Sequence, residues 1–264
     1  MKISSVRSAD GTSIAFETAG SGPPLILVGG AFCDRKARAS GTPLATLLAP
    51  RFTVFSYDRR GRGDSGDTKE WAVERELEDL AALLAEAGGS AFVYGISSGA
   101  ILALAAATEQ LSIPKLALYE PPLMRAAAQT KPFLTVANEL IAASAAGERT
   151  RAVELFLGKV MHLPDPALEQ MRASPSWSGL EALAHTLSYD LRITTLGPSL
   201  LERASSVRSS TLALYGEACA PWMREAIVNL AHAVPNGQAR MLAGQTHDVN
   251  PEPLAQALSE FFSA

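Results

Sequence analysis

The stretch Gly95-Ile96-Ser97-Ser98-Gly99 places a serine between two glycines and is the first group of residues suited to catalysis. It follows an apolar run, Ala91 to Tyr94, and precedes small and apolar residues that begin near Ala100, which predicts a strand, a sharp turn and a helix. A serine in such a turn has a strained backbone, and flanking glycines avoid the clash that larger side chains would make. We predict that Ser97 is a nucleophile and that the Ser98 N–H, at the helix start, stabilises an oxyanion.

A serine that attacks an acyl group needs a base, which is normally histidine. The chain has four histidines. His247 lies between the last predicted strand and the last predicted helix, on the sheet edge expected to carry Ser97, so it is the predicted base. His162 and His232 fall within or at the end of predicted helices, where surface and capping roles are more common. His185 is a candidate for substrate contact.

Continuous apolar runs supply the strands that must position these residues. The run Leu25 to Val28 is typical of a strand buried on both faces. Similar runs occupy Phe52 to Tyr57, Ala91 to Tyr94, Lys115 to Tyr119, Thr211 to Tyr215 and Ala239 to Leu242. Helical patterns separate most of them, at Ala72 to Ala87, Ala100 to Thr108, Trp222 to His232 and Pro253 to Phe262. This alternation predicts an α/β fold with a mostly parallel sheet flanked by helices.

Two further segments complete the predicted organisation. Alternating residues on either side of Asp10-Gly11 predict an antiparallel hairpin at the sheet edge. Between about Met124 and Val207 the pattern is helical, without a convincing buried strand. We therefore expect a core domain of residues 1–122 and 208–264, with an all-helical cap, residues 123–207, over the carboxyl ends of the strands.

Four motifs in order resemble those of the α/β-hydrolase superfamily. They are Gly22–Gly30, Tyr57–Ser65, the serine turn at 95–99, and Gln245–Asp248. The resemblance covers nearly all of the chain and implies an α/β-hydrolase fold with its catalytic histidine at His247. It also points to the Ala31 N–H as the second oxyanion donor, in a loop where Gly29-Gly30 stands in place of the usual His-Gly. For the charged stretch Arg59 to Ser65 it implies that arginine–aspartate pairs brace neighbouring turns, with phosphate binding as the alternative.

The acidic member of the triad is where the chain departs from the common family pattern. Most relatives carry an aspartate after the penultimate strand, but Cys219 occupies that position here. A thiol cannot supply the negative charge that orients an imidazole unless it ionises. Glu120 ends the strand Lys115 to Tyr119 and is followed by two prolines, which stiffen the exit. Some α/β-hydrolases, including haloalkane dehalogenases and the fungal zearalenone lactonase, carry their acid after this strand.

We therefore predict a triad of Ser97, His247 and Glu120. The alternative for Glu120 is a non-catalytic role, as a solvated carboxylate at a strand end. Glu217 and Asp248 are rival acids, although Asp248 adjoins the histidine and sequence neighbours seldom face each other in a loop.

Residues that could contact a substrate cluster in and near the predicted cap. The candidates are Phe32, Met124, Trp177, His185, Tyr189 and Trp222. His185 and Tyr189 are four apart, so on a helix they share one face. Trp177 could equally seat the cap on the core. A small, mainly apolar pocket with one or two polar contacts is expected, and Cys33 and Cys219 either line it or are reduced bystanders.

Composition excludes several classes of protein. The chain has 264 residues, 47% of them hydrophobic, and a net charge of −4, so it can form a core but lacks the basic surface typical of nucleic-acid or membrane binding. It has neither a signal-peptide pattern nor a run long enough to span a membrane, and its two cysteines give no disulfide framework or metal spacing. We expect a cytoplasmic monomer or homodimer that acts on a small molecule.

These observations predict a serine hydrolase that cleaves an ester or lactone through an acyl-enzyme, without a metal or organic cofactor. Perhydrolase (haloperoxidase) activity, carbon–carbon bond hydrolysis and hydroxynitrile cleavage are alternatives on the same fold and triad. Dehalogenase and epoxide hydrolase chemistry is disfavoured, because relatives with those activities need an aspartate at the position that Ser97 occupies here. The missing aspartate leaves a second class open, a ligand-binding protein without catalysis.

Overall fold

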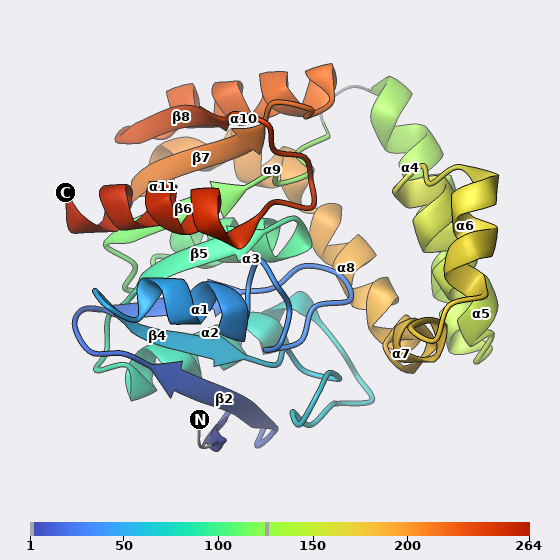
Figure 1. Cartoon of the computed structure of the whole chain (residues 1–264), viewed down its shortest axis with the longest axis horizontal. Helices are drawn as coiled ribbons and strands as arrows, with labels where there is room; N and C mark the ends of the chain where they lie inside the picture. The colour runs from blue at the N-terminus through green and yellow to red at the C-terminus, as the bar shows by residue number, and fades with distance from the viewer. Residues whose placement is uncertain (1–2, 125–126) are drawn as a thin grey trace.

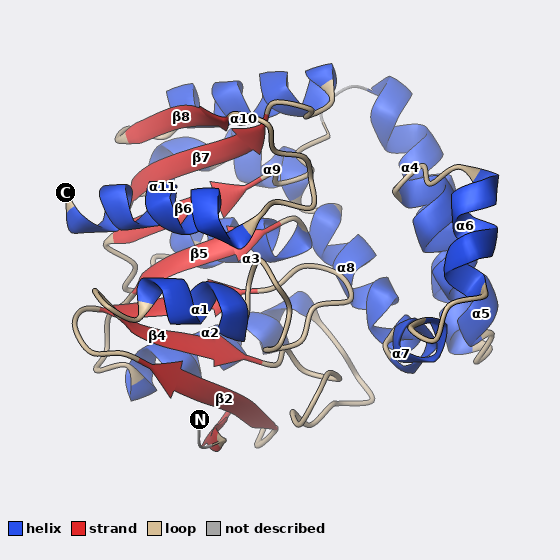
Figure 2. Cartoon of the chain, in the orientation of Figure 1, coloured by secondary structure: helices blue, strands red, loops and turns tan. Residues whose placement is uncertain are grey.

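One eight-stranded sheet organises the computed structural model of the protein, which describes residues 3–124 and 127–264 (Figures 1 and 2). Its strands are β1 (Ser4–Arg7), β2 (Ser13–Ala19), β3 (Pro24–Val28), β4 (Thr53–Tyr57), β5 (Phe92–Ile96), β6 (Lys115–Tyr119), β7 (Ser210–Gly216) and β8 (Gly237–Leu242). The spatial order is β1-β2-β4-β3-β5-β6-β7-β8. Strands β3 to β8 are parallel, while β1 and β2 form the antiparallel edge predicted from the hairpin. The expected α/β-hydrolase fold is therefore confirmed.

Helices cover both faces of the sheet because its central strands are apolar on both sides. In β3, Leu25 and Leu27 pack with α1 (Thr42–Leu48) and α11 (Pro251–Ser263), which lie in front of the sheet in Figure 1. Ile26 and Val28 belong to the core on the opposite face. The helices on that face are α2 (Val73–Glu86), α3 (Ser98–Thr108) and α10 (Pro221–Ala233). Every residue of α3 is buried, as expected for a helix that is apolar all round.

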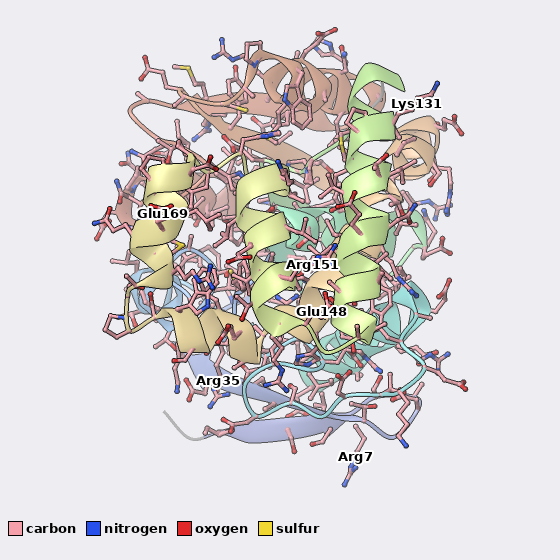
Figure 3. The ribbon with its side chains drawn as sticks, turned by 90° about the vertical axis from the view of Figure 1, so that its right-hand side faces the viewer. Arg7, Arg35, Lys131, Glu148, Arg151 and Glu169 are labelled. Carbon is pink, nitrogen blue, oxygen red and sulfur yellow. The ribbon has the colours of Figure 1, made fainter. Side chains whose placement is uncertain are left out.

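Between β6 and β7 the described chain is entirely helical, and we call residues 123–207 the helical insertion. Its helices are α4 (Ala127–Ala145), α5 (Arg149–Glu154), the π-helical η1 (Leu155–Val160), α6 (Asp165–Arg172), α7 (Trp177–Ala182), η2 (Ala184–Thr186), α8 (Leu187–Thr194), α9 (Gly197–Glu202) and η3 (Ala204–Ser206). Figure 1 shows α4 to α7 standing off the carboxyl ends of the strands, and Figure 3 views α4, α5 and α6 from outside, with charged residues such as Lys131 and Glu169 labelled on them.

Some elements differ from the sequence prediction. Within the stretch expected to be helical, α5 is followed by the wider turns of η1 and not by a continuous α-helix. The helix after the serine turn begins at Ser98 rather than near Ala100. Helices α1 and α9 were not predicted, because each is short and lacks a long periodic pattern. Among the described residues, no helix is both long and apolar enough to cross a membrane.

Candidate active site

Ser97 occupies the sharp turn between β5 and α3. Its backbone has φ 55° and ψ −126°, a strained conformation for a residue with a side chain. The Ser97 N–H donates to the Tyr119 carbonyl at 2.9 Å, which fixes the turn against the end of β6. Ser97 therefore lies beside the residue that follows β6, Glu120, although 23 positions separate the two in the sequence.

The flanking glycines are required by close backbone contacts. A Cβ on Gly95 would lie 2.5 Å from the Gly99 carbonyl oxygen, and a Cβ on Gly99 would lie 2.5 Å from the carbonyl oxygens of Val28 and Gly29. A Cβ on Gly30 would come within 3.0 Å of Ser97 Cβ. The turn is thus packed directly against residues 29–32, which carry Ala31. We call this segment the oxyanion loop after the role predicted for the Ala31 N–H.

Glu120 and His247 form the second part of the site. The Nδ1 atom of His247 lies 2.7 Å from Oε2 of Glu120, and the Gly216 N–H donates to Oε1 at 2.9 Å. Glu120 has a positive φ of 44° and is only 2% exposed. Three parallel strands meet here, because Glu120 follows β6, Gly216 ends β7 and His247 follows β8.

The charge of Glu120 is set by competing effects. Burial raises the pKa of its carboxyl group, but the hydrogen bonds from His247 and the Gly216 N–H outweigh it, and the pKa lies below its ordinary value. Glu120 is therefore ionised at neutral pH and only accepts hydrogen bonds. The proton in the contact must then be on Nδ1 of His247, so Nε2 is the ring nitrogen that can accept a proton.

Cys219, at the usual position of the acid, cannot replace this carboxylate. Burial, together with the nearby Glu120 charge, raises the pKa of its thiol to about 12. The thiol is therefore neutral at physiological pH.

The rival acids contact other groups. Glu217 accepts a hydrogen bond from the Gly244 N–H at 2.8 Å, and Asp248 pairs with Arg38 at 2.7 Å on the surface. Within the described chain, Glu120 is the only carboxylate that hydrogen-bonds to His247. The geometry therefore favours Glu120 as the acid. Because Glu120 is buried, it is not the solvated carboxylate of the alternative interpretation.

The Ser97 hydroxyl and Nε2 of His247 make no hydrogen bond to any described residue. Contacts between a nucleophile and its base are often long before substrate binds.

A cavity of about 380 Å³ lies between the core and the helical insertion. Ala31, Ser97 and Ser98 line it from the core. The insertion contributes Phe133, Phe156 and Leu191 to the lining. Two of the predicted substrate contacts also line the cavity: Met124, from the insertion, and Trp222, from α10. The lining is mainly apolar, and its size suits a small organic molecule.

Four of the predicted substrate contacts lie outside this lining. Phe32 packs edge to face on Phe156, and Trp177 is buried inside the helical insertion. Tyr189 stacks on Trp71 at 4.7 Å between ring centroids, and its hydroxyl donates to Asp67 at 3.0 Å. His185 faces the same carboxylate at 3.6 Å. His185 and Tyr189 do share a face, but that face seats the insertion on the core.

Besides the two serines, four polar residues on the cavity are not among the predicted substrate contacts: Lys159, His162, Asp190 and Thr194. Lys159 and His162 belong to or follow the π-helical η1, and His162 has a positive φ of 56°. A π-helical turn often marks a functional site, but nothing in the sequence distinguishes it from an ordinary helix.

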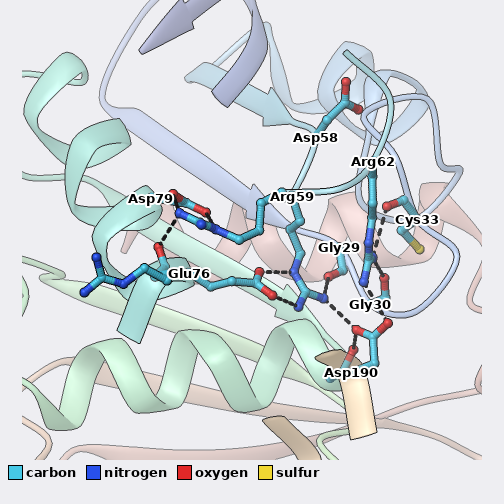
Figure 4. A network of polar contacts seen from close by, with 12 residues as sticks. Gly29, Gly30, Cys33, Asp58, Arg59, Arg62, Glu76, Asp79 and Asp190 are labelled. Carbon is cyan, nitrogen blue, oxygen red and sulfur yellow. Dashed lines mark hydrogen bonds and ion pairs between the residues drawn. The ribbon is translucent and has the colours of Figure 1, made fainter. Parts of the chain in front are cut away.

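The stretch Arg59 to Ser65 braces the loops around the site, as the resemblance implied (Figure 4). Arg59 pairs with Glu76 at 2.6 Å and Arg60 with Asp79 at 2.6 Å, and all four side chains are buried. Because both guanidinium groups are already paired with buried carboxylates, they are not available to bind a phosphate. Cys33 lies in the neighbouring loop, where burial raises the pKa of its thiol. In the part of the chain that the structure describes, no group of three or more acidic, histidine or cysteine side chains is arranged to hold a metal ion.

The parallel sheet flanked by helices, with a serine in the turn between β5 and α3, is the arrangement typical of α/β hydrolases. A model of the alpha/beta hydrolase family matches residues 25–258. The chain therefore belongs to the alpha/beta hydrolase family.

Solved structures are consistent with this assignment. An alpha/beta hydrolase from Sphaerobacter thermophilus is 46% identical, with a TM-score of 0.88 over 98% of this chain and 100% of that one. A thermophilic esterase from Thermogutta terrifontis is 23% identical (TM-score 0.72, 100% and 98% covered). The 2-hydroxy-6-oxo-6-phenylhexa-2,4-dienoate hydrolase of a Rhodococcus strain is 17% identical (TM-score 0.72, 100% and 99% covered). The last two likenesses concern the fold alone.

Replacing the acid tests the triad assignment. Glu120→Gln should lower kcat for ester hydrolysis by about 10³-fold, because an amide neither fixes the histidine tautomer nor stabilises its protonated ring. The matched variants Glu217→Gln and Asp248→Asn should stay within about twofold of wild type, since neither side chain contacts His247. Steady-state kinetics of all three variants make the comparison. Near-wild-type activity in Glu120→Gln would reject the assignment.

The lowered pKa of Glu120 also predicts a pH dependence of stability. A carboxyl group whose pKa is lower in the folded state stabilises that state above its ordinary pKa of 4.5, and the contribution is lost as pH falls through the folded value. The difference in unfolding free energy between wild type and Glu120→Gln should therefore narrow below about pH 4.5. Urea denaturation of both proteins between about pH 6 and pH 3 measures it. A difference that widens over that range would contradict the prediction.

Proposed function

We propose that the protein is a serine hydrolase that cleaves a carboxylic ester or lactone of a small, mainly apolar substrate. The observation that carries the proposal is the buried, ionised Glu120 at 2.7 Å from Nδ1 of His247, on the sheet edge where Ser97 occupies the strained turn. A carboxylate that orients an imidazole through Nδ1 allows the other ring nitrogen to take the proton of a serine hydroxyl. Membership of a hydrolase family supports the same chemistry.

The first half of the reaction forms an acyl-enzyme. Nε2 of His247 takes the proton of the Ser97 hydroxyl as its oxygen attacks the substrate carbonyl. The carbonyl oxygen becomes an oxyanion, which the N–H groups of Ala31 and Ser98 stabilise. The ring of His247 is now positively charged, and Glu120 stabilises that charge. His247 then gives the proton to the departing alkoxide, which leaves an ester on Ser97.

Water completes the cycle by the same route in reverse. His247 removes a proton from water as the oxygen attacks the acyl group, and the proton returns to Ser97 as its ester bond breaks. A carboxylic acid is released, or a hydroxy acid if the substrate is a lactone. The helical insertion acts as a cap over the cavity, and its apolar side chains select an apolar substrate.

An ester and lactone panel, combined with fluorophosphonate labelling, tests the proposal. The wild-type protein should hydrolyse short-chain p-nitrophenyl esters or small lactones and acquire one adduct, absent after prior denaturation. Ser97→Ala should lose the adduct and lower kcat by about 10³-fold or more, because no other nucleophile occupies the turn. Mass spectrometry and steady-state rates are the measurements.

The neighbouring serine is the matched control. Ser98→Ala should keep the adduct, since only its backbone N–H faces the oxyanion. An active protein whose adduct persists in Ser97→Ala would contradict the assigned nucleophile. A wild-type protein with neither turnover nor adduct would instead favour the ligand-binding alternative.

A further inference from the structure

A carboxylate from the helical insertion reaches the catalytic core. Asp190 lies on α8 and is only 1% exposed. Its Oδ1 accepts hydrogen bonds from Arg59 Nη1 and the Ser98 hydroxyl, both at 2.7 Å, and its Oδ2 accepts one from Arg62 Nη2 at 2.7 Å (Figure 4). Asp190 also lines the cavity beside Ser97 and Ser98. No residue of the proposed triad contacts it, so its role lies elsewhere.

Both arginines continue from Asp190 to the oxyanion loop. Arg59 Nη1 donates to the Gly29 carbonyl at 3.2 Å. Arg62 Nη1 donates to the Gly30 carbonyl and, at 3.2 Å, to the Cys33 carbonyl. A single buried carboxylate thus holds two cations whose other donors fix the backbone on either side of Ala31.

The contact with the Gly30 carbonyl bears directly on the oxyanion donor. The carbonyl of Gly30 and the N–H of Ala31 belong to one peptide unit, which is planar and trans, so the two groups point in opposite directions. Holding the Gly30 oxygen with Arg62 therefore fixes the direction of the Ala31 N–H. A cation on the carbonyl also polarises the peptide, which strengthens its N–H as a donor.

Arg62 depends on Asp190 for its charge compensation, whereas Arg59 does not. Arg59 has a second carboxylate partner in Glu76, at 2.6 Å. Among the described residues, Arg62 pairs with Asp190 alone. Burial raises the pKa of Asp190, but the charges of Arg62 and Arg59 outweigh it, so the carboxyl group is ionised at neutral pH. Without that charge, a buried guanidinium would be left uncompensated beside the oxyanion loop.

We propose that Asp190 is a positioning residue for the oxyanion hole. Through Arg62 it fixes the peptide that carries the Ala31 N–H, and through the Ser98 hydroxyl it holds the start of α3, where the second donor lies. The inference rests on the proposed serine hydrolase function and extends it, because it makes the transition-state site depend on the seating of the helical insertion. The insertion then contributes to the rate as well as to substrate selection.

Asp190→Asn tests the proposal, because it keeps the shape of the side chain and removes its charge. The expected result is a fall of about 10-fold to 100-fold in kcat for a neutral ester, with KM changed less than about threefold, since the oxyanion forms only in the transition state. Rates are expressed per active site titrated with fluorophosphonate, which removes any loss of folded protein. The inhibition constant of a boronic acid, a tetrahedral mimic, should rise with the fall in kcat/KM, while that of an unreactive amide analogue should not change.

Asp67→Asn is the matched control. Asp67 accepts the hydrogen bond from Tyr189, also on α8, so this variant weakens the seating of the insertion without touching the oxyanion loop. It should keep kcat within about twofold of wild type. An equal fall in both variants would overturn the proposal, because loss of seating alone would then explain the effect.

Two further results separate the possible failures. An Asp190→Asn protein with unchanged kcat, or with only a raised KM, would overturn the inference and leave the proposed function intact. A wild-type protein without ester or lactone hydrolysis would overturn both. If Asp190→Asn does not fold, Ser98→Ala removes one of the three contacts alone, and it should lower kcat per titrated site by about threefold to tenfold. No change in that variant would overturn the proposal.

Discussion

The hydrogen bond between Glu120 and His247 is the interaction on which the rest of the site depends. It spans the carboxyl ends of β6, β7 and β8, because the Gly216 N–H fixes one oxygen of the carboxylate and Nδ1 of His247 binds the other. The strands must be parallel and in register for these residues to meet. Gly216 must also lack a side chain, since a Cβ there would lie 2.4 Å from the Gln245 carbonyl oxygen. A neutral cysteine at position 219 is then tolerated, because the charge comes from the neighbouring strand.

Backbone strain gathers around the same place. The residues other than glycine with positive φ in the described chain are Phe32, Ser97, Gln110, Glu120 and His162. Gln110 follows the end of α3, away from the site, but the others lie in the oxyanion loop, in the serine turn, at the acid or on the cavity. Such conformations persist only where the surroundings enforce them. Around Phe32, Arg59 and Arg62 hold the carbonyls of the loop. The Ser97 N–H is held by the Tyr119 carbonyl, and the Glu120 carboxylate by His247 and the Gly216 N–H.

Sequence alone predicts the parts of this arrangement that rest on local pattern. A glycine-flanked serine between an apolar run and a helix is a local signal. Glu120 was predicted because it follows a strand after which some α/β-hydrolases carry their acid. Asp190 has no such signal, since its partner Arg62 lies 128 positions earlier and only the packed fold brings the two together. Spacing also showed that His185 and Tyr189 share a face, but not that this face packs on Trp71 rather than on the cavity. Which surface an amphipathic face meets is decided by tertiary packing.

Proton NMR of the His247 ring tests the central claim most directly. A proton held between an imidazole nitrogen and a buried carboxylate resonates far downfield and exchanges slowly. The account predicts such a resonance in wild type and in Asp248→Asn, its loss in Glu120→Gln, and its assignment to Nδ1 of His247 by nitrogen-15 labelling. A downfield resonance that survives in Glu120→Gln, or that disappears in Asp248→Asn, would show that another acid holds the histidine and would contradict the account.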